Sequence, residues 1–282
     1  MKKFFNQILL FSFFALIILE IKPIYLLTTE KYKEKVAGNE VYFSIKKSEK
    51  KNKCKILIIG DSVGKQLFDN FSESDTLNSL ACNQAISMAG QFILLNNYFL
   101  AGNEVDTVFL IYSPFSFRNN LNEVFTYHYF IKPFYKNYNS FFSEKVVQQL
   151  DKIPYSDFYW LPNILTSNWA PNFKSNDKVD FTFLSPISIE YLQKIKTLST
   201  KYDFKLIILP TPTKESNKNF VQKLNNQEIL INGFENEFKN YFENIIYLND
   251  SNFIDKVHLK VPQIYTEIYK KKFICNKLVV NS

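Results

Sequence analysis

The chain is poor in the residues that bind metals and cofactors. Its 282 residues include only two histidines, three cysteines and six glycines. No CxxC pair or Cys/His cluster occurs, so a structural zinc site is not expected. Gly-x-Gly-x-x-Gly is absent. The string from Gly60 to Gln66 fails as a phosphate loop, because three residues separate its glycines and no hydroxyl follows Lys65. We therefore expect no metal and no cofactor.

Clustered positive charge is also missing, although the formal net charge is +7. Most lysines stand singly among Asn, Glu and Ser, and the one dense run spans residues 46–53. This pattern favours a solvated surface over nucleic-acid binding, and it also suits contact with an anionic membrane or polymer. A hydrophobic content of 46% and a charged content of 22% permit a sizeable core.

The N-terminus has the pattern of an export signal. Met1-Lys-Lys precedes an apolar run from Ile8 to Leu19, which Glu20 follows. No Ala-x-Ala-like cleavage site follows, so residues 1–27 favour an uncleaved signal anchor; the alternative is a cleaved signal peptide. The positive-inside rule then predicts a single-pass protein of the cytoplasmic membrane with its domain in the periplasm or at the cell surface. A cleaved signal would make the protein secreted.

Residues 28–53 are rich in Lys and Glu without a sustained apolar period, and we interpret them as a linker or stalk. The remaining residues, 54–282, are enough for one α/β domain. Cys54 and Cys82 fall near the starts of two expected neighbouring strands, so a disulfide between them is one possibility. The other is that both, with Cys275, are buried thiols.

The stretch from Ile56 to Gly64 is the centre of the expected domain. Its apolar run is typical of a buried parallel strand, and it stops at Gly60-Asp61-Ser62. A tight turn after the strand would place the Ser62 hydroxyl at the carboxyl end of the sheet, where ligands of open α/β sheets bind. We expected Gly60 and Gly64 to supply backbone freedom to that turn.

Apolar runs and helical patterns alternate along the rest of the chain, which predicts a parallel sheet of about five strands. The expected strands are Cys54–Gly60, Ala81–Ser87, Val105–Tyr112, Phe204–Leu209 and Asn244–Leu248. The expected helices begin at Val63 and cover Gln91–Leu100, Ser188–Tyr202, Phe220–Phe242 with a break at Gly233, and Pro262–Phe273.

The alternation stops at about residues 115–180, which are rich in aromatic side chains. This length exceeds a plain connection and predicts an insertion, with a helix near Ser143 to Leu150. The aromatic residues suit either a small core of the insertion's own or a substrate-covering lid that stacks on sugar rings. His128, inside the insertion, fits a packed or surface residue better than a second catalyst.

Asp255 and His258 come after the last expected strand. A spacing of three residues lets both side chains project to one side of a turn, so that the carboxylate accepts a proton from the imidazole and fixes its tautomer. A serine becomes a nucleophile only where a base takes its proton. If the last strand joins the sheet, this pair returns to the edge that carries Ser62.

Gly60-Asp61-Ser62 after a strand and Asp255-x-x-His258 before the last helix resemble the SGNH (GDSL-type) hydrolase and acyltransferase superfamily. The resemblance spans roughly residues 54–275 and implies a three-layer αβα sandwich, flavodoxin-like in topology. It implies Ser62 as nucleophile, His258 as general base and Asp255 as the group that orients the base.

The resemblance also implies an oxyanion hole, formed by the backbone N–H groups of Ser62 and Gly90. The family's third donor, an Asn in a Gly-x-Asn-Asp string after the third strand, has no counterpart here. The alternatives are Ser113 or Ser116, Asn119 or Asn120 reaching back, and an incomplete hole.

The expected function is therefore acyl-ester chemistry, as an esterase or an O-acyltransferase, commonly on acetyl groups in families of this kind. The anchor and the aromatic insertion favour a cell-envelope or exported polysaccharide as partner. The alternative is a catalytically inactive, membrane-tethered assembly or binding protein that keeps the fold. The membrane is reached through the N-terminal helix, and no nucleic acid is expected as a partner.

Overall fold

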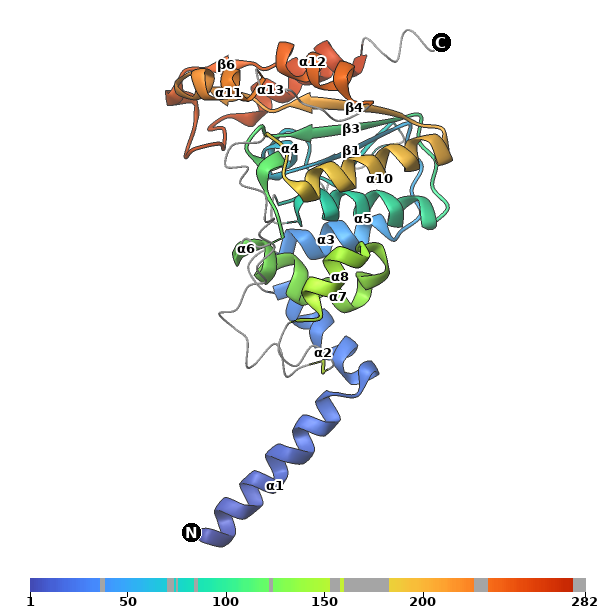
Figure 1. Cartoon of the computed structure of the whole chain (residues 1–282), viewed down its shortest axis with the longest axis vertical. Coiled ribbons are helices and arrows are strands. Elements are labelled where there is room, and N and C mark those ends of the chain that lie inside the picture. The colour runs from blue at the N-terminus through green and yellow to red at the C-terminus, as the bar shows by residue number, and fades with distance from the viewer. Residues whose placement is uncertain are drawn as a thin grey trace. The chain divides into compact units, whose positions relative to one another are not determined.

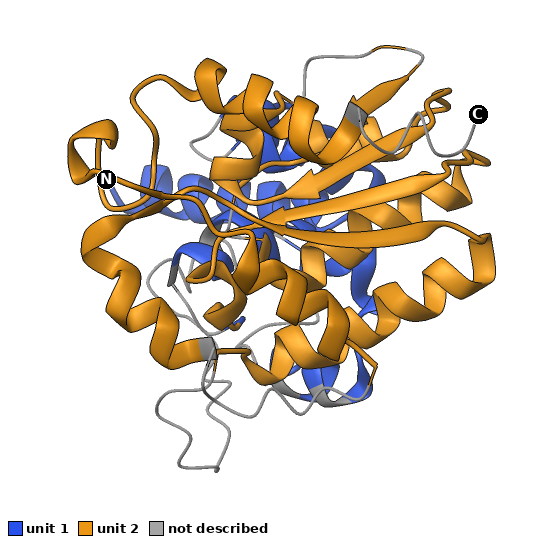
Figure 2. Ribbon diagram, turned by 90° about the horizontal axis from the view of Figure 1, so that it is seen from above, with its two compact units in different colours: residues 1–42, 121–174 blue, residues 43–120, 175–282 orange. Residues whose placement is uncertain are grey.

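The structure is a computed structural model, and it describes residues 1–35, 39–69, 74, 76–83, 86–121, 124–152, 158–159, 183–225 and 233–275. The chain divides into two compact units (Figure 2). The first contains residues 1–42 and 121–174, and the second contains residues 43–120 and 175–282. The second segment of the first unit, residues 121–174, thus falls within the insertion expected at about residues 115–180.

The first unit begins with an apolar helix, α1 (Lys2–Leu19), which carries no buried residue. Its 18 residues have a mean hydropathy of 1.6. Within the described ranges it is the one helix long and apolar enough to cross a bilayer, a property that signal sequences share.

The predicted stalk is largely helical rather than an extended linker. It holds the end of α2 (Lys22–Lys35) and all of α3 (Asn39–Ser48). Within the first unit, the Tyr42 hydroxyl donates to Glu30 at 2.8 Å. The end of α3 belongs to the second unit, where Ile45 is buried and the Ser48 hydroxyl accepts a hydrogen bond from Asn97 at 3.3 Å.

The described part of the insertion is helical and has its own aromatic core. Its elements are α6 (Val124–Thr126), η3 (Tyr127–Ile131), α7 (Lys132–Tyr138), η4 (Asn139–Phe141) and α8 (Glu144–Leu150). The helix expected near Ser143 to Leu150 is confirmed, with Ser143 as its N-cap. Buried rings meet inside the unit, including Phe130 with Phe142 at 6.1 Å between centroids. This packing supports the interpretation of the aromatic residues as a local core.

The second unit contains a four-stranded parallel sheet in the order β2-β1-β3-β4 (Figure 1). The strands are β1 (Ile56–Gly60), β2 (Leu77–Ser79), β3 (Thr107–Tyr112) and β4 (Lys205–Pro210). All five residues of β1 are buried, as expected of a central parallel strand. Gly60 pairs with Ile111, which pairs with Leu209, so three strands end at the same level. The segments that follow them share one edge.

Two strand predictions are wrong. The second strand was expected at Ala81–Ser87 but ends at Ser79, and Ser87 already begins helix α5 (Ser87–Leu100). The fifth was expected in the main sheet, but β6 (Tyr247–Leu248) pairs with β5 (Thr213–Lys214) in a separate two-stranded sheet. Pro210 and Pro212 lack the backbone N–H groups that would continue the β4 ladder, which explains the break.

Helices cover both faces of the sheet. Figure 1 shows α5 and α10 (Pro186–Tyr202) side by side along one face, and the Phe99 and Tyr202 rings stack between them at 4.3 Å. The other face buries a cluster in which alternate strand residues, such as Ile58 and Ile111, pack with side chains of α4 (Ser62–Leu67) and α13 (Pro262–Tyr269). Because successive side chains of a strand point to opposite faces, each strand packs against helices on both sides of the sheet.

The predicted helix over Phe220–Phe242 is divided into α11 (Lys218–Asn225) and α12 (Glu235–Glu243). Gly233, the expected break, has a φ of +95°, a backbone conformation that favours glycine. Two buried tyrosines fix the last helices to the sheet edge: Tyr241 donates to the carbonyl of Tyr112 at 2.8 Å and Tyr269 to that of Pro210 at 2.5 Å. After α13 the chain continues as η7 (Lys270–Cys275).

Candidate active site

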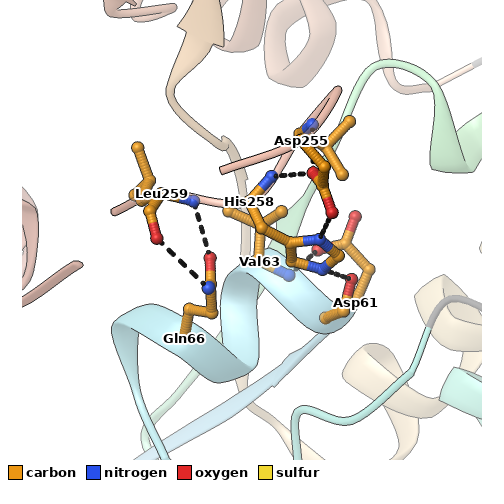
Figure 3. A network of polar contacts seen from close by, with 8 residues as sticks. Asp61, Val63, Gln66, Asp255, His258 and Leu259 are labelled. Carbon is orange, nitrogen blue, oxygen red and sulfur yellow. Dashed lines mark hydrogen bonds and ion pairs between the residues drawn. The ribbon is translucent and has the colours of Figure 1, made fainter. Parts of the chain in front are cut away.

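Ser62, His258 and Asp255 form one hydrogen-bonded chain at the sheet edge. His258 Nε2 lies 2.9 Å from Ser62 Oγ, and His258 Nδ1 lies 2.7 Å from Asp255 Oδ2 (Figure 3). A carboxylate only accepts, so Nδ1 carries the proton and Nε2 is left to accept from the serine hydroxyl. The His258 side chain is 32% exposed, which leaves it accessible to a ligand. The structure therefore brings together the three residues that the two sequence motifs named.

Ser62 is positioned by the first turn of α4. Asp61 is the N-cap, and its Oδ1 accepts the backbone N–H groups of Val63 at 3.0 Å and Gly64 at 3.1 Å. Aspartate is a favoured N-cap because it satisfies donors that the helix leaves open. Asp61 Oδ1 thus takes the second and third N–H groups of the helix and leaves that of Ser62, the first, outside its reach.

Gly60 and Gly64 are required by close approach, not by backbone freedom. Neither residue has a positive φ, which corrects the sequence-based explanation. A Cβ atom at Gly60 would stand 2.2 Å from the carbonyl oxygen of Ile111, and one at Gly64 would stand 2.8 Å from it. The two glycines therefore let α4 lie directly against β3, which sets the depth of Ser62.

Asp61 also ties the nucleophile to the loop after β3. Its Oδ2 accepts the backbone N–H of Ser113 at 2.8 Å and the hydroxyl of Ser116 at 2.6 Å. Burial raises the pKa of this carboxyl, and its four hydrogen bonds act in the opposite direction. All four partners donate, so they match the ionised form. Ser116 gives its proton to Asp61 and is not a free oxyanion donor.

Asp255 is ionised by its local backbone. Hydrogen bonds from the N–H groups of His258 and Val257 hold the pKa of this carboxyl well below its ordinary value. These bonds are 2.8 and 2.9 Å long and converge on Oδ1, which leaves Oδ2 for the imidazole. The tight turn between the two residues thus fixes the orientation of the base.

A side chain of α4 holds the segment that carries His258 beside Ser62. Gln66 Oε1 accepts the backbone N–H of Leu259 at 3.0 Å, and Gln66 Nε2 donates to the Leu259 carbonyl at 3.5 Å (Figure 3). Gln66 is one helical turn after Ser62 and so shares its face of α4. Gln66 therefore holds Leu259, the residue that follows His258, by two hydrogen bonds. The sequence alone gave no indication of this contact, because it links residues 193 positions apart.

We expect Gln66→Ala to lower kcat about tenfold with little change in KM, because His258 then loses a support while the substrate contacts remain. Stability should fall by only about 1 kcal/mol, the net value of one such hydrogen bond. Steady-state kinetics of ester hydrolysis and thermal unfolding measure the two effects. Gln66→Glu keeps the acceptor for Leu259 N–H and should recover most of kcat. Equal kcat in the wild type and Gln66→Ala would contradict the positioning role.

The expected oxyanion donors are placed differently from the prediction. Gly90 is the fourth residue of α5 instead of a residue in the turn before it, and a Cβ atom there would lie 2.3 Å from that of Ile86. The N–H of a fourth helical residue bonds within its own helix, so the expected donor role does not fit this position. Ser87, the first residue of α5, is fully buried and has a φ of 50°, and a serine gives no sequence signal of such a backbone.

The other residues considered as oxyanion donors, and His128, lie at the following places in the structure. The hydroxyl oxygen of Ser113 accepts the N–H of Phe115 at 3.3 Å. Asn119 and Asn120 follow η2 (Ser116–Arg118), and the carbonyl of Asn119 accepts the Ser185 hydroxyl at 2.8 Å. The side chain of His128, in η3, lies outside the described residues.

Cys54 and Cys82 are both buried thiols, so the disulfide is not formed. The Cys275 side chain lies outside the part of the chain that the structure describes. Over the same part, no group of three His, Cys, Asp or Glu side chains gathers that could hold a metal ion.

Comparison with models of known protein families and with curated proteins finds no match to this chain.

Proposed function

We propose that the chain is a serine-dependent esterase or O-acyltransferase of the SGNH type, acting on acyl esters, most simply acetyl esters, of a cell-envelope or exported polysaccharide. The observation that carries the proposal is the chain of contacts from Ser62 Oγ through His258 to Asp255, at 2.9 and 2.7 Å. The strand order β2-β1-β3-β4 with helices on both faces supports the finer assignment of a flavodoxin-like αβα sandwich.

In the proposed reaction Ser62 Oγ attacks the ester carbonyl carbon while His258 Nε2 takes the hydroxyl proton. Negative charge then develops on the carbonyl oxygen, and Asp255 stabilises the imidazolium. His258 returns the proton to the leaving alcohol, which gives an acyl-enzyme. Water or a sugar hydroxyl next attacks the acyl carbon while His258 takes its proton. His258 then gives that proton to Ser62 Oγ as the bond between Oγ and the acyl carbon breaks, which frees the product and restores the serine. Water as acceptor makes an esterase, and a polymer hydroxyl makes an acyltransferase.

The developing oxyanion is assigned to backbone donors at two helix starts. The N–H of Ser62 is the first of α4, and Asp61 takes the two that follow it. The second donor is assigned to the turn into α5, where Ser87 has the left-handed backbone that a glycine would ordinarily adopt. Each such donor contributes about 10² to 10³ in rate.

The proposed location is the outer side of the cytoplasmic membrane, with α1 as a single-pass anchor. The apolar composition of α1 and the lysines at its N-terminal end support this orientation. An exported position also suits an envelope polymer as the substrate.

A fluorophosphonate probe tests the proposal directly, because it labels only serines that a base activates. Full-length wild-type protein should be labelled, and Ser62→Ala should not be. Asp106→Ala, which removes an exposed carboxylate of the same unit, is the matched control and should label normally. A folded wild type that stays unlabelled would favour the alternative of a non-catalytic, membrane-tethered assembly protein.

A further inference from the structure

The chain contains one arginine among 34 basic residues, and it lies at the sheet edge that carries Ser62. Arg118 is the last residue of η2, whose first residue, Ser116, donates to Asp61 Oδ2 at 2.6 Å. Asp61 is in turn the residue before Ser62. A short and fixed segment thus connects Arg118 to the nucleophile.

The guanidinium of Arg118 lies over one aromatic ring, which a second ring supports. Its Cζ lies 5.6 Å from the centroid of the Phe220 ring, and the Phe115 ring stacks on Phe220 at 5.8 Å with an interplanar angle of 11°. A 3₁₀ turn has three residues, so Phe115 and Arg118 project from the same side of η2. Phe220 comes from α11, on the segment that continues from the carboxyl end of β4. The three side chains therefore form one platform at the edge where ligands of such sheets bind.

Arg118 is exposed, and no carboxylate of the described residues lies within ion-pair distance of it. A nearby lysine at the same edge differs, because Lys218 pairs with Glu215 at 3.1 Å. The guanidinium is thus fixed in direction while its charge and its hydrogen-bond donors stay available. This is the arrangement that binds planar anions through two parallel N–H bonds.

We propose that the platform of Phe115, Phe220 and Arg118 is a subsite for an anionic group of the substrate, a carboxylate or a phosphate. The inference rests on the proposed function and narrows it to acyl esters carried by an acidic polymer, with the anion bound a short distance from the ester. The net charge of +7 also attracts such polymers to the protein. An arginine suits this role better than the lysines used elsewhere in the chain, because its fork fixes the orientation of the anion.

Binding to full-length Ser62→Ala in detergent micelles, measured by titration calorimetry, tests the subsite without any reaction. The probes are a polygalacturonate oligomer for carboxylate, a glycerol phosphate oligomer for phosphate, and a xylan oligomer as the neutral reference. At least one anionic probe should bind more tightly than the neutral one. Adding Arg118→Gln should weaken that binding at least about tenfold, the loss of a charge-assisted contact. Adding Lys218→Gln, a cation already paired, should leave it unchanged.

Hydrolysis of 4-nitrophenyl acetate, which carries no anion, separates this inference from the proposed function. With Ser62 in place, Lys218→Gln, a change outside the triad and the platform, should hydrolyse it within about twofold of the wild type. Equal binding of the anionic and neutral probes, or undiminished anion binding in Arg118→Gln, would overturn the subsite even in an active esterase. A wild type that binds the anion but hydrolyses no ester would overturn the proposed function and leave the subsite as a binding site.

Discussion

Full-length protein with His258→Ala is expected to hydrolyse 4-nitrophenyl acetate with a kcat lower by about 10³ to 10⁴, because among the residues that the structure describes only His258 offers a base to the Ser62 hydroxyl. The contact of 2.9 Å between Ser62 Oγ and His258 Nε2 would be lost, and the serine would keep its proton. Nitrophenolate release measures the effect. Added imidazole should restore part of the rate to His258→Ala but none to Ser62→Ala, since it replaces only the base.

Asp255 determines how this activity depends on pH. Since its pKa is held below the ordinary value, Asp255 stays ionised as the pH falls from about 8 to 5 and adds no protonation step to the acidic limb of kcat/KM. The slope of that limb should therefore not exceed one. A lowered aspartate pKa also stabilises the fold above the ordinary pKa, and this stability is lost as the pH falls toward the lowered value. A slope of two, or a fully active His258→Ala, would contradict the triad. Lys256→Ala, an exposed change in the same turn, is the control and should stay within about twofold.

The second large effect is expected on stability. Asp61→Ala should lower the free energy of unfolding by roughly 3 kcal/mol or more, because it leaves buried donors of Val63, Gly64, Ser113 and Ser116 without their acceptor. It also removes the N-cap of the helix that begins with the nucleophile. Urea unfolding of the full-length protein, followed by circular dichroism, measures the change.

Asp61→Asn is the conservative variant for this position. It keeps one oxygen as an acceptor but turns an amide donor toward the other donors. The free energy of unfolding of Asp61→Asn should therefore lie between those of the wild type and Asp61→Ala. Asp106→Ala removes an exposed carboxylate and should change stability by no more than about 0.5 kcal/mol. Equal stability of Asp61→Ala and Asp106→Ala would show that the loop after β3 is held by other contacts.

The sequence predicted three of the strands well, and it named the three side chains that meet in the structure. The run from Ile56 to Gly60 is fully buried as β1, and β3 and β4 lie within a residue or two of their predicted bounds. Long apolar runs that end at glycine or proline have few alternatives in a chain of this size. Ser62 and His258 were paired by their order and by the expected edge, and the structure places them in hydrogen-bond contact.

Short elements and distant contacts were not predictable in the same way. The predicted strand Ala81–Ser87 is short and only partly apolar, so its pattern does not separate a strand from the approach to a buried helix, and in the structure its last residue begins α5. β6 has only two paired residues, too few for a periodic signal. The bond between Ser116 and Asp61 joins residues 55 positions apart, and neither residue type marks it.

The separation of Ser62 and His258 by 196 residues has a consequence for the order of events during synthesis. The N-terminal segment with α1 leaves the ribosome first, and the serine follows soon after it, long before its base exists. A serine hydroxyl without a base is a weak nucleophile, so Ser62 would be chemically quiet until the segment that carries His258 has been made. The proposed activity would begin only when that segment docks beside α4.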